Sequence, residues 1–467
     1  MAISRTLTIS LIVACALFME NMDATVIATS LPALARDLGE SPVALKLALT
    51  SYLVSLAVFI PISGWMSDRF GARTIFRGAI GVFMLGSILC GLSNSLAGFV
   101  ACRFLQGMGG AMMVPVGRLI ILRSVSKSEL VKALSYLTVP ALLGPVIGPP
   151  LGGFITTYFH WRWIFFINIP ISLVGMALAT RHIENLRSPE VPPLDVSGFL
   201  LSAVGCSTLM LGLATLGRHL VSGAISGALI AVGIVALAFY AWHARRTPFP
   251  LLNFKLLKVP TFRMSIVGGA FFRMGIGAIP FLLPLMLQLG FGLDPFQSGL
   301  LTCASAAGAM LMKTVAPPIL RRHGFRGVLA FNGALGAISV AAFGLFTAST
   351  PLFVILAVVL AGGCIRSLQF TSLNAIAYAD VSRADMSQAT SLAGVAQQLA
   401  VGMGVTIGGL ALQASNAVQG HDVISAGDFW PAFLFIGLVA ALSVPFARRL
   451  PEGAGAELAG RPHAAKA

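Results

Sequence analysis

Two carboxyl groups and an amide interrupt an otherwise apolar stretch near the start of the chain. Glu20, Asn21 and Asp23 all lie within residues 7–32. Glu20 and Asp23 are about one helical turn apart on nearly the same face, so each opposes the ionisation of the other. A carboxyl in such surroundings can take up and release a proton; the alternative is a fixed ion pair. We predict Asp23 as a proton carrier that Glu20 assists.

Arg103 is the cation best placed to meet these acids. It lies in another apolar stretch, just before Gln106 and Gly107. A buried arginine needs a carboxylate or water, unless it extends to the nearer membrane surface. At about 1.5 Å per residue, Asp23 and Arg103 lie within roughly 5 Å of the same depth in their helices. We therefore predict an Asp23–Arg103 ion pair that protonation breaks.

The other polar or adaptable side chains inside apolar stretches predict a substrate cavity. Away from the ends of these stretches, four cations (Arg103, Arg273, Lys313 and Arg366) and two acids give a balance of +2. A wet cavity with that balance would admit zwitterions and anions as well as cations. Most Met and Phe side chains pack or face lipid, but a few could line an adaptable pocket. The predicted cavity residues are Asn21, Gln106, Met112, Met113, Phe272, Arg273, Arg366, Gln369 and Gln397.

The composition excludes a soluble or disordered protein. Only 10% of the 467 residues are charged and 57% are hydrophobic, whereas soluble domains carry about 25% charged residues. The net charge of +15 does not indicate a nucleic-acid partner, because the basic residues fall at the ends of apolar segments. We predict an integral membrane protein.

Several kinds of chemistry are not expected. The sequence contains no Gly-Lys pair and so no phosphate-binding loop for ATP. The seven His are dispersed and the six Cys lie inside apolar runs, which predicts no metal site and no disulfide framework. We expect no enzyme activity and no cofactor; a proton gradient would supply the energy.

Fourteen segments are long and apolar enough to span a bilayer, which needs about 20 residues. In the first segment, Glu20, Asn21 and Asp23 argue against a cleaved signal peptide. With the N-terminus in the cytoplasm, 23 Lys and Arg fall at inside ends and four in outside loops, which predicts an N-in, C-in orientation. The segments are 7–32, 44–66, 74–93, 97–119, 134–157, 162–180, 196–216, 222–242, 261–288, 296–316, 327–347, 352–373, 390–413 and 429–447.

An internal repeat predicts two halves. The loops at 68–73 and 321–326 share Arg-x-Gly-x-Arg, and each follows the second helix of a six-helix set. Paired halves are typical of secondary transporters. The predicted all-α fold comprises a six-helix bundle over 1–181, linkers and an extra helix pair over 182–260, a second six-helix bundle over 261–448, and a cytoplasmic tail over 449–467.

The first of these loops has a recognisable pattern. Gly64, Asp68, Arg69, Gly71 and Arg73 match Gly-x-x-x-Asp-Arg-x-Gly-x-Arg at every position. This resembles the signature loop of the major facilitator superfamily, which implies a conformational latch. From the residues alone, the loop could simply be a basic topology signal. The second copy has Arg321 in place of the acid, so we do not expect a latch there.

A glycine- and proline-rich segment resembles the antiporter motif of exporters in that superfamily. Gly144, Gly148 and Gly152 recur every four residues and predict a smooth ridge for close helix packing. Packing alone would explain the ridge, whereas the resemblance implies export. The motif residues are Gly144, Pro145, Gly148, Pro149, Gly152 and Gly153.

Further segments resemble the fourteen-spanner drug:proton antiporters (QacA/EmrB-like). Residues 161–170 match a segment typical of that family, although their aromatic residues alone would indicate an interfacial belt. Residues 245–251 and 369–374 are most similar to its MdtD-like branch. The pattern Asp23-x-Thr25-Val26 implies that Asp23 is the proton-binding acid, and the arginine motif at Arg103 is associated with proton-coupled members.

The predicted function is proton-coupled export of amphipathic drug-like compounds across the bacterial inner membrane by alternating access. One alternative is a dedicated exporter of a single metabolite, anionic if Arg273 and Arg366 face it. The other is a membrane sensor that does not transport. The expected partners are a small-molecule substrate, protons and the lipid bilayer. We expect a monomer, and the need for a separate adaptor protein is left open.

Overall fold

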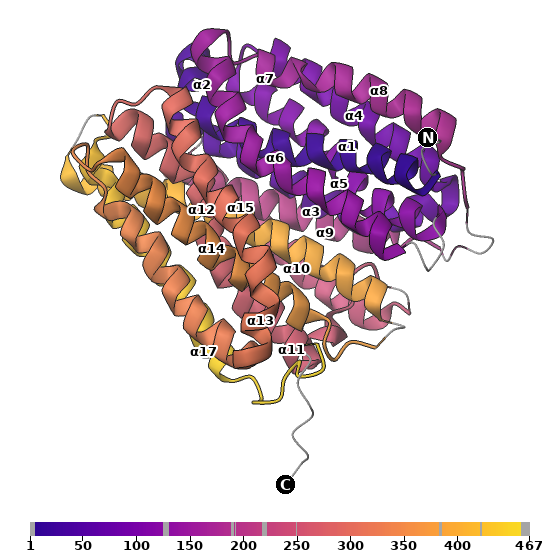
Figure 1. Ribbon diagram of the computed structural model, residues 1–467. Helices are drawn as coiled ribbons and strands as arrows, with labels where there is room; N and C mark the ends of the chain where they lie inside the picture. Colours follow the sequence, from indigo (N-terminus) through magenta and orange to yellow (C-terminus); the bar gives the residue numbers. More distant parts are fainter. Residues whose placement is uncertain are drawn as a thin grey trace. The chain divides into compact units, whose positions relative to one another are not determined.

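The structure of the chain is a computed structural model, and helices joined by short loops make up most of its described residues (Figure 1). No β-strand occurs in these parts. The described residues are 5–124, 130–187, 191, 193–216, 222–248, 250–382, 385–420 and 423–458.

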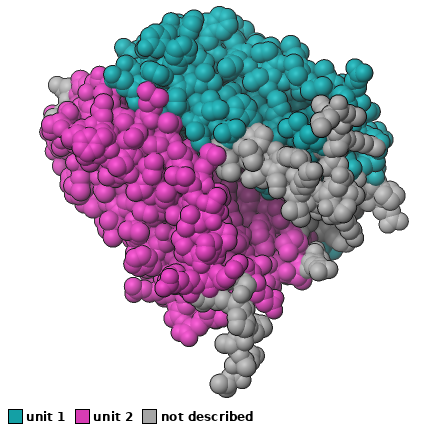
Figure 2. All heavy atoms as spheres, viewed as in Figure 1, with its two compact units in different colours: residues 1–251, 294–299 teal, residues 252–293, 300–467 magenta. Residues whose placement is uncertain are grey.

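The chain divides into two compact units, coloured separately in Figure 2. Unit 1 comprises Met1–Leu251 and Asp294–Gly299, and unit 2 comprises Leu252–Leu293 and Leu300–Ala467. The helices of unit 1 are α1 (Arg5–Val26), α2 (Leu31–Leu38), α3 (Lys46–Phe70), α4 (Ala72–Leu92), α5 (Leu96–Ser124), α6 (Leu130–Tyr158), α7 (Trp163–Phe166), α8 (Asn168–His182), α9 (Val196–Thr215) and α10 (Gly223–Arg246). The helices that lie wholly or mostly in unit 2 are α11 (Pro260–Arg263), α12 (Gly269–Leu285), α13 (Pro295–Ala342), α14 (Leu352–Ala377), α15 (Met386–Gln419), α16 (Phe429–Ala441) and α17 (Ser443–Arg448).

Both predicted repeat loops turn on a glycine. Gly71 separates α3 from α4 with φ 98°, and Gly324 breaks α13 with φ 71°. Left-handed values of this kind favour glycine because it has no Cβ atom. The shared Arg-x-Gly-x-Arg pattern therefore marks equivalent backbone turns in the two units.

In unit 1, α6 lies along α1 through the predicted glycine ridge (Figure 1). A Cβ atom on Gly148 would collide with the Thr25 side chain, and one on Gly152 would collide with the Val26 carbonyl oxygen. A Cβ atom on Gly144 would lie 3.0 Å from the backbone nitrogen of Met22. The ridge is confirmed, and it holds α6 against the helix that carries Glu20 and Asp23.

The extra helix pair belongs to unit 1, where α9 packs on α10 and on α3. Asp195 closes the base of the pair. Its Oδ1 atom accepts a hydrogen bond of 2.8 Å from the Gly198 backbone and lies 2.7 Å from Nε2 of His243. One carboxylate thus caps α9 and joins it to the last turn of α10.

In unit 2, α12 packs along α15 and α16. A π-helical turn, Met264–Gly268, precedes α12 and interrupts its regular hydrogen bonding. Such turns free carbonyl oxygens for other donors. Here the Ser265 carbonyl accepts a 2.6 Å hydrogen bond from Nη1 of Arg273, so the irregular turn helps to hold a buried cation.

Twelve helical segments in the described residues are long and apolar enough to cross a membrane. One of the twelve is a 51-residue stretch, Pro295–Leu345, that contains the break at Gly324. The prediction of an all-α membrane protein is therefore confirmed.

Candidate functional site

Asp23 is the centre of a buried polar network in unit 1. Its Oδ2 atom accepts a 2.7 Å hydrogen bond from Nη1 of Arg103, and both side chains are almost completely buried. Its Oδ1 atom accepts hydrogen bonds from Nε2 of Gln106 at 2.9 Å and Nδ2 of Asn168 at 3.0 Å. The predicted Asp23–Arg103 contact is therefore present, and two amide donors complete it.

The local fold explains how these groups converge. Arg103 and Gln106 are three residues apart on α5 and so share a helix face. Ser87 on α4 accepts hydrogen bonds from Gln106 at 2.7 Å and from Asn168 at 3.2 Å. The serine hydroxyl fixes both amides, and the amides in turn orient the carboxylate of Asp23 toward Arg103.

Glu20 lies beside this network rather than within it. Its side chain is largely buried, and its Oε1 atom accepts a 3.4 Å hydrogen bond from the hydroxyl of Tyr52. The Tyr52 ring faces the guanidinium of Arg103, 4.4 Å from its Cζ atom. The two acids of α1 therefore contact different partners: one an arginine, the other a tyrosine.

Unit 2 contains buried arginines in a different setting. Arg273 is bound by the Ser265 carbonyl and by Oδ1 of Asn374 at 3.1 Å. Arg366 donates to Oγ of Ser305 at 2.6 Å, and its Nη1 atom has no hydrogen-bond partner among the described residues. No carboxylate within 4.0 Å of either guanidinium is found in those parts of the chain.

Several other predicted cavity residues are buried. Met112 and Met113 lie in the apolar core of unit 1, and Phe272 lies in that of unit 2. Gln369 is fully buried and accepts a 3.1 Å hydrogen bond from Asn332. A role for these four residues in a cavity stays a prediction.

The remaining two predicted cavity residues are less enclosed. Asn21 donates back to the Leu17 carbonyl of its own helix at 2.7 Å, and Gln397 is half-buried on α15. Their roles also stay predictions.

The predicted latch packs against the segment that follows α8. Nη1 of Arg73 donates to the Ile183 carbonyl at 3.3 Å, and the backbone of Thr74 donates to Oδ1 of Asn185 at 3.2 Å. A Cβ atom on Gly71 would collide with the Asn185 side chain. Gly64 and Arg69 are exposed, and Asp68 is half-buried.

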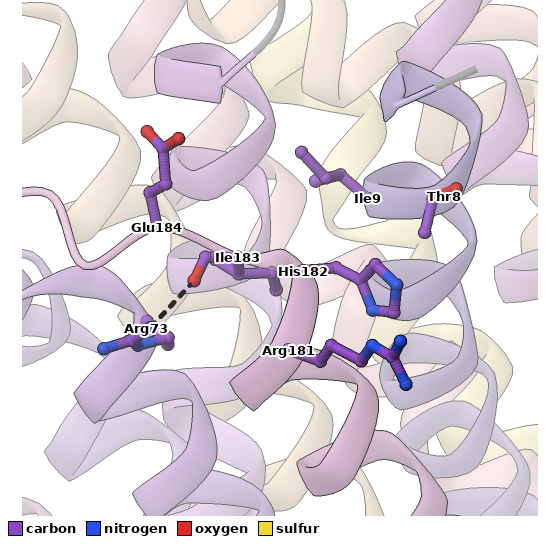
Figure 3. A pocket seen from close by; sticks show the side chains of 7 residues that line it. All are labelled: Thr8, Ile9, Arg73, Arg181, His182, Ile183 and Glu184. Carbon is purple, nitrogen blue, oxygen red and sulfur yellow. Dashed lines mark hydrogen bonds between the residues drawn. The ribbon is translucent and has the colours of Figure 1, made fainter.

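A pocket of about 540 Å³ opens beside this contact (Figure 3). Figure 3 shows Arg181 and His182 side by side, while the carboxylate of Glu184 points away from Arg181. Arg73 closes another part of the rim through its bond to Ile183. Arg73, Arg181 and His182 make the pocket basic. It lies at the C-terminal end of α8, away from Asp23.

Three polar residues of the network were not predicted as site residues: Tyr52, Ser87 and Asn168. Each is a polar side chain within a strongly apolar segment, and that signal could have marked it. Trp161 also differs from the expected aromatic belt. It is almost fully buried and donates from Nε1 to Oδ2 of Asp37 at 3.0 Å. Asn168 of the same segment reaches Asp23, whereas Trp163, between Trp161 and Asn168, is exposed.

Comparison with known proteins decides the family. The chain matches the family model of the Major Facilitator Superfamily over residues 13–405 and 265–466. The chain belongs to the major facilitator superfamily. It is therefore a transporter rather than an enzyme, it acts on small molecules, and it is a multi-pass protein of the inner membrane.

Relatives and solved structures of this superfamily agree in sequence and in fold. The chain is 39% identical to multidrug resistance protein MdtD of Escherichia coli (strain 55989 / EAEC) over 93% of this chain and 91% of that protein. It is 37% identical to a protein of the same name from Pectobacterium carotovorum subsp. carotovorum (strain PC1), over 93% of each. A D-xylose–proton symporter, 15% identical, matches 97% of this chain and 99% of its own with a TM-score of 0.69. A bacterial homologue of the human lysosomal transporter Spinster, 14% identical, matches all of both chains with a TM-score of 0.68.

Proposed function

We propose that this superfamily member is a proton-coupled exporter of amphipathic drug-like compounds. The observation that carries the proposal is the buried Asp23–Arg103 pair with its amide donors. A proton on Asp23 removes the charge that balances Arg103, and an unbalanced buried cation is costly. Proton uptake therefore favours a different arrangement of the helices around Arg103, which is how a proton gradient can drive alternating access.

The relatives support the direction and the kind of cargo. Two of them are named multidrug resistance proteins, and resistance by a transporter implies export. The close packing of α6 on α1 through Gly148 places the predicted antiporter motif directly against the helix of Asp23. We propose that this contact links proton binding to movement of the two helices.

We propose fourteen membrane spans with both termini in the cytoplasm. The long stretch Pro295–Leu345 counts as two spans because Gly324 breaks it. Helix α6 is not among the twelve segments, and we count it as a further span because it has 29 residues and a mostly apolar sequence. The distribution of Lys and Arg supports the orientation. We also propose the division at 1–181, 182–260, 261–448 and 449–467, a monomeric state, and no cofactor besides the proton gradient.

A second cargo class has support in unit 2. Arg273 and Arg366 are buried without a carboxylate in the described residues. A substrate with an acidic group would supply the missing negative charge. The second candidate function is therefore export of acidic or zwitterionic compounds, either alone or beside cationic ones.

The test is proton release from energised inside-out vesicles that contain the wild type or Asp23→Asn. The probes are ethidium as a cation, a fluoroquinolone as a zwitterion and deoxycholate as an anion. Release of protons with several unrelated cations, lost in the variant, would establish the proposed function. Release with the acidic probes alone would establish the second candidate. Wild-type vesicles that respond to none of a broadened panel, with intact protein, would overturn both in favour of a sensor.

A further inference from the structure

Tyr52 on α3 contacts both of the groups that surround Asp23. Its hydroxyl donates to Oε1 of Glu20 at 3.4 Å, and its ring faces the Cζ atom of Arg103 at 4.4 Å. The side chain is 2% exposed, so neither contact is replaced by bulk water. A guanidinium over an aromatic face is attracted by the ring, and this attraction grows when both groups are desolvated.

Two glycines of α5 make room for this tyrosine. A Cβ atom on Gly107 would lie 2.7 Å from the carbonyl oxygen of Tyr52. A Cβ atom on Gly110 would lie 2.9 Å from its hydroxyl oxygen and 3.6 Å from Cγ of Glu20. The helix that supplies Arg103 therefore also shapes the space for the Tyr52–Glu20 contact. This explains why glycine follows Gln106 and recurs one turn later.

The charged and titratable groups around Tyr52 come from three helices. Glu20 of α1 and Arg103 of α5 contact it directly, and Asp23 of α1 lies behind Arg103, to which it is paired. Sγ of Cys90 on α4 donates to Oε1 of Gln106 at 3.9 Å. Cys90 therefore contacts the network through Gln106. Within the described parts of the chain, no hydrogen bond or ion pair joins Glu20 directly to Arg103, whereas Tyr52 contacts both.

We propose that Tyr52 is the positioning residue that couples Glu20 to the Asp23–Arg103 pair. Ionised Glu20 holds the tyrosine hydroxyl, and the held ring fixes the guanidinium against Asp23. When Glu20 takes up a proton, its hold on the hydroxyl weakens and the ring is free to leave Arg103. Protonation of Glu20 thereby weakens the pairing of Asp23 with Arg103. This inference rests on the proposed proton coupling and adds a component to it.

The experiment uses the full chain in lipid nanodiscs and follows the infrared absorption of protonated carboxyl groups during a pH titration. This readout needs no substrate, so it separates the inference from the question of what is exported. Tyr52→Phe keeps the ring but removes the hydroxyl. It should move one carboxyl transition toward higher pH by about half to one pH unit, because ionised Glu20 loses a donor.

Repeating the titration in a Glu20→Gln background shows whether Glu20 is the carboxyl group that shifts. In Glu20→Gln, the Tyr52→Phe change should have no further effect on the titration. Gly110→Ala should move the titration in the same direction, because its Cβ atom would lie 2.9 Å from the Tyr52 hydroxyl oxygen and would displace the hydroxyl from its bond to Glu20. Tyr240→Phe, which alters another buried tyrosine of unit 1, is the matched control and should leave the titration unchanged.

Two results would overturn the proposal. A Tyr52→Phe titration identical to the wild type would show that the hydroxyl does not act on Glu20. A shift that persists in the Glu20→Gln background would show that Tyr52 acts on another group. Failure of every transport assay with a normal Tyr52→Phe shift would instead count against the proposed function alone.

Discussion

The two units bury arginine in opposite ways. In unit 1, Arg103 has a carboxylate at 2.7 Å, a glutamine acceptor on its own helix and an aromatic ring at 4.4 Å. In unit 2, Arg273 and Arg366 are bound by neutral oxygens. Neutral partners return only part of the free energy that an ion loses when it leaves water. The charge of Arg103 is therefore balanced within unit 1, whereas Arg273 and Arg366 of unit 2 carry positive charge that an anion would stabilise.

The sequence accounts for this difference. Glu20 and Asp23 are the two acids inside the predicted spans, and both belong to unit 1. Away from the span ends, unit 2 has three cations in its predicted spans, Arg273, Lys313 and Arg366, and it has no acid in these spans. A proton can change the charge balance within the spans of unit 1, whereas the predicted spans of unit 2 contain no carboxyl to bind it. The proposed proton chemistry therefore belongs to unit 1, and the proposed recognition of substrate charge belongs to unit 2.

The largest expected effect comes from removing the partner of Asp23. Arg103→Met leaves a buried carboxylate without its counter-ion, which costs about 3–5 kcal/mol. We expect a marked fall in the thermal unfolding temperature of the purified protein and a loss of transport. The double variant Asp23→Asn, Arg103→Met should regain much of the stability but no proton coupling. Equal stability of the single and double variants would mean that the pair is not what balances unit 1.

The same experiment on unit 2 should give the reverse result. Arg366→Met removes a buried cation that has no carboxylate, so stability should stay the same or rise by up to about 4 kcal/mol. Transport of an acidic probe should fall by about 10- to 100-fold, the effect of losing one hydrogen bond to a charged group. Lys313→Met is the control, because its exposed amine donates to Thr371. Strong destabilisation by Arg366→Met would remove the contrast between the units.

A smaller effect should follow from disturbing helix packing. Gly148→Ala places a Cβ atom against Thr25 on the helix of Asp23, and overpacking of this kind costs about 1–3 kcal/mol. Gly404→Ala does the same against the Met274 carbonyl on the helix of Arg273. Both should lower the unfolding temperature, but only Gly148→Ala should alter the pH dependence of transport. Gly78→Ala, with open space around it, is the control for stability.

The smallest effect is expected at the second repeat loop. Nη1 of Arg326 lies 2.9 Å from Oε1 of Glu452, but that glutamate is 90% exposed. Exposed ion pairs contribute little to stability. Glu452→Gln should leave the unfolding temperature unchanged within error, whereas Asn185→Ala at the first loop should lower it, since Asn185 accepts from the Thr74 backbone. Equal responses would show that the two loops are anchored alike.

Much of the fold was predictable because it depends on local composition. Segments of about 20 apolar residues identify helices wherever they occur. The pair Asp23–Arg103 was also within reach, since two charges at one depth in a bilayer have few other partners. The aromatic residues of 161–170 do not all face the surface: Trp161 is almost fully buried and bonded to Asp37, whereas Trp163 is exposed, and composition alone cannot show which of them turns inward.

The sequence by itself determined the class of protein, the repeat and the residues that can carry charge in the membrane. These follow from transfer free energies, which depend on residue type and on the length of each apolar run. Only the tertiary structure decided which polar groups meet. Tyr52, Ser87 and Asn168 come from three different helices, and their contacts depend on how closely α3, α4 and α8 approach α1 and α5. That approach is set by packing of side chains and glycines between helices, which no single segment encodes.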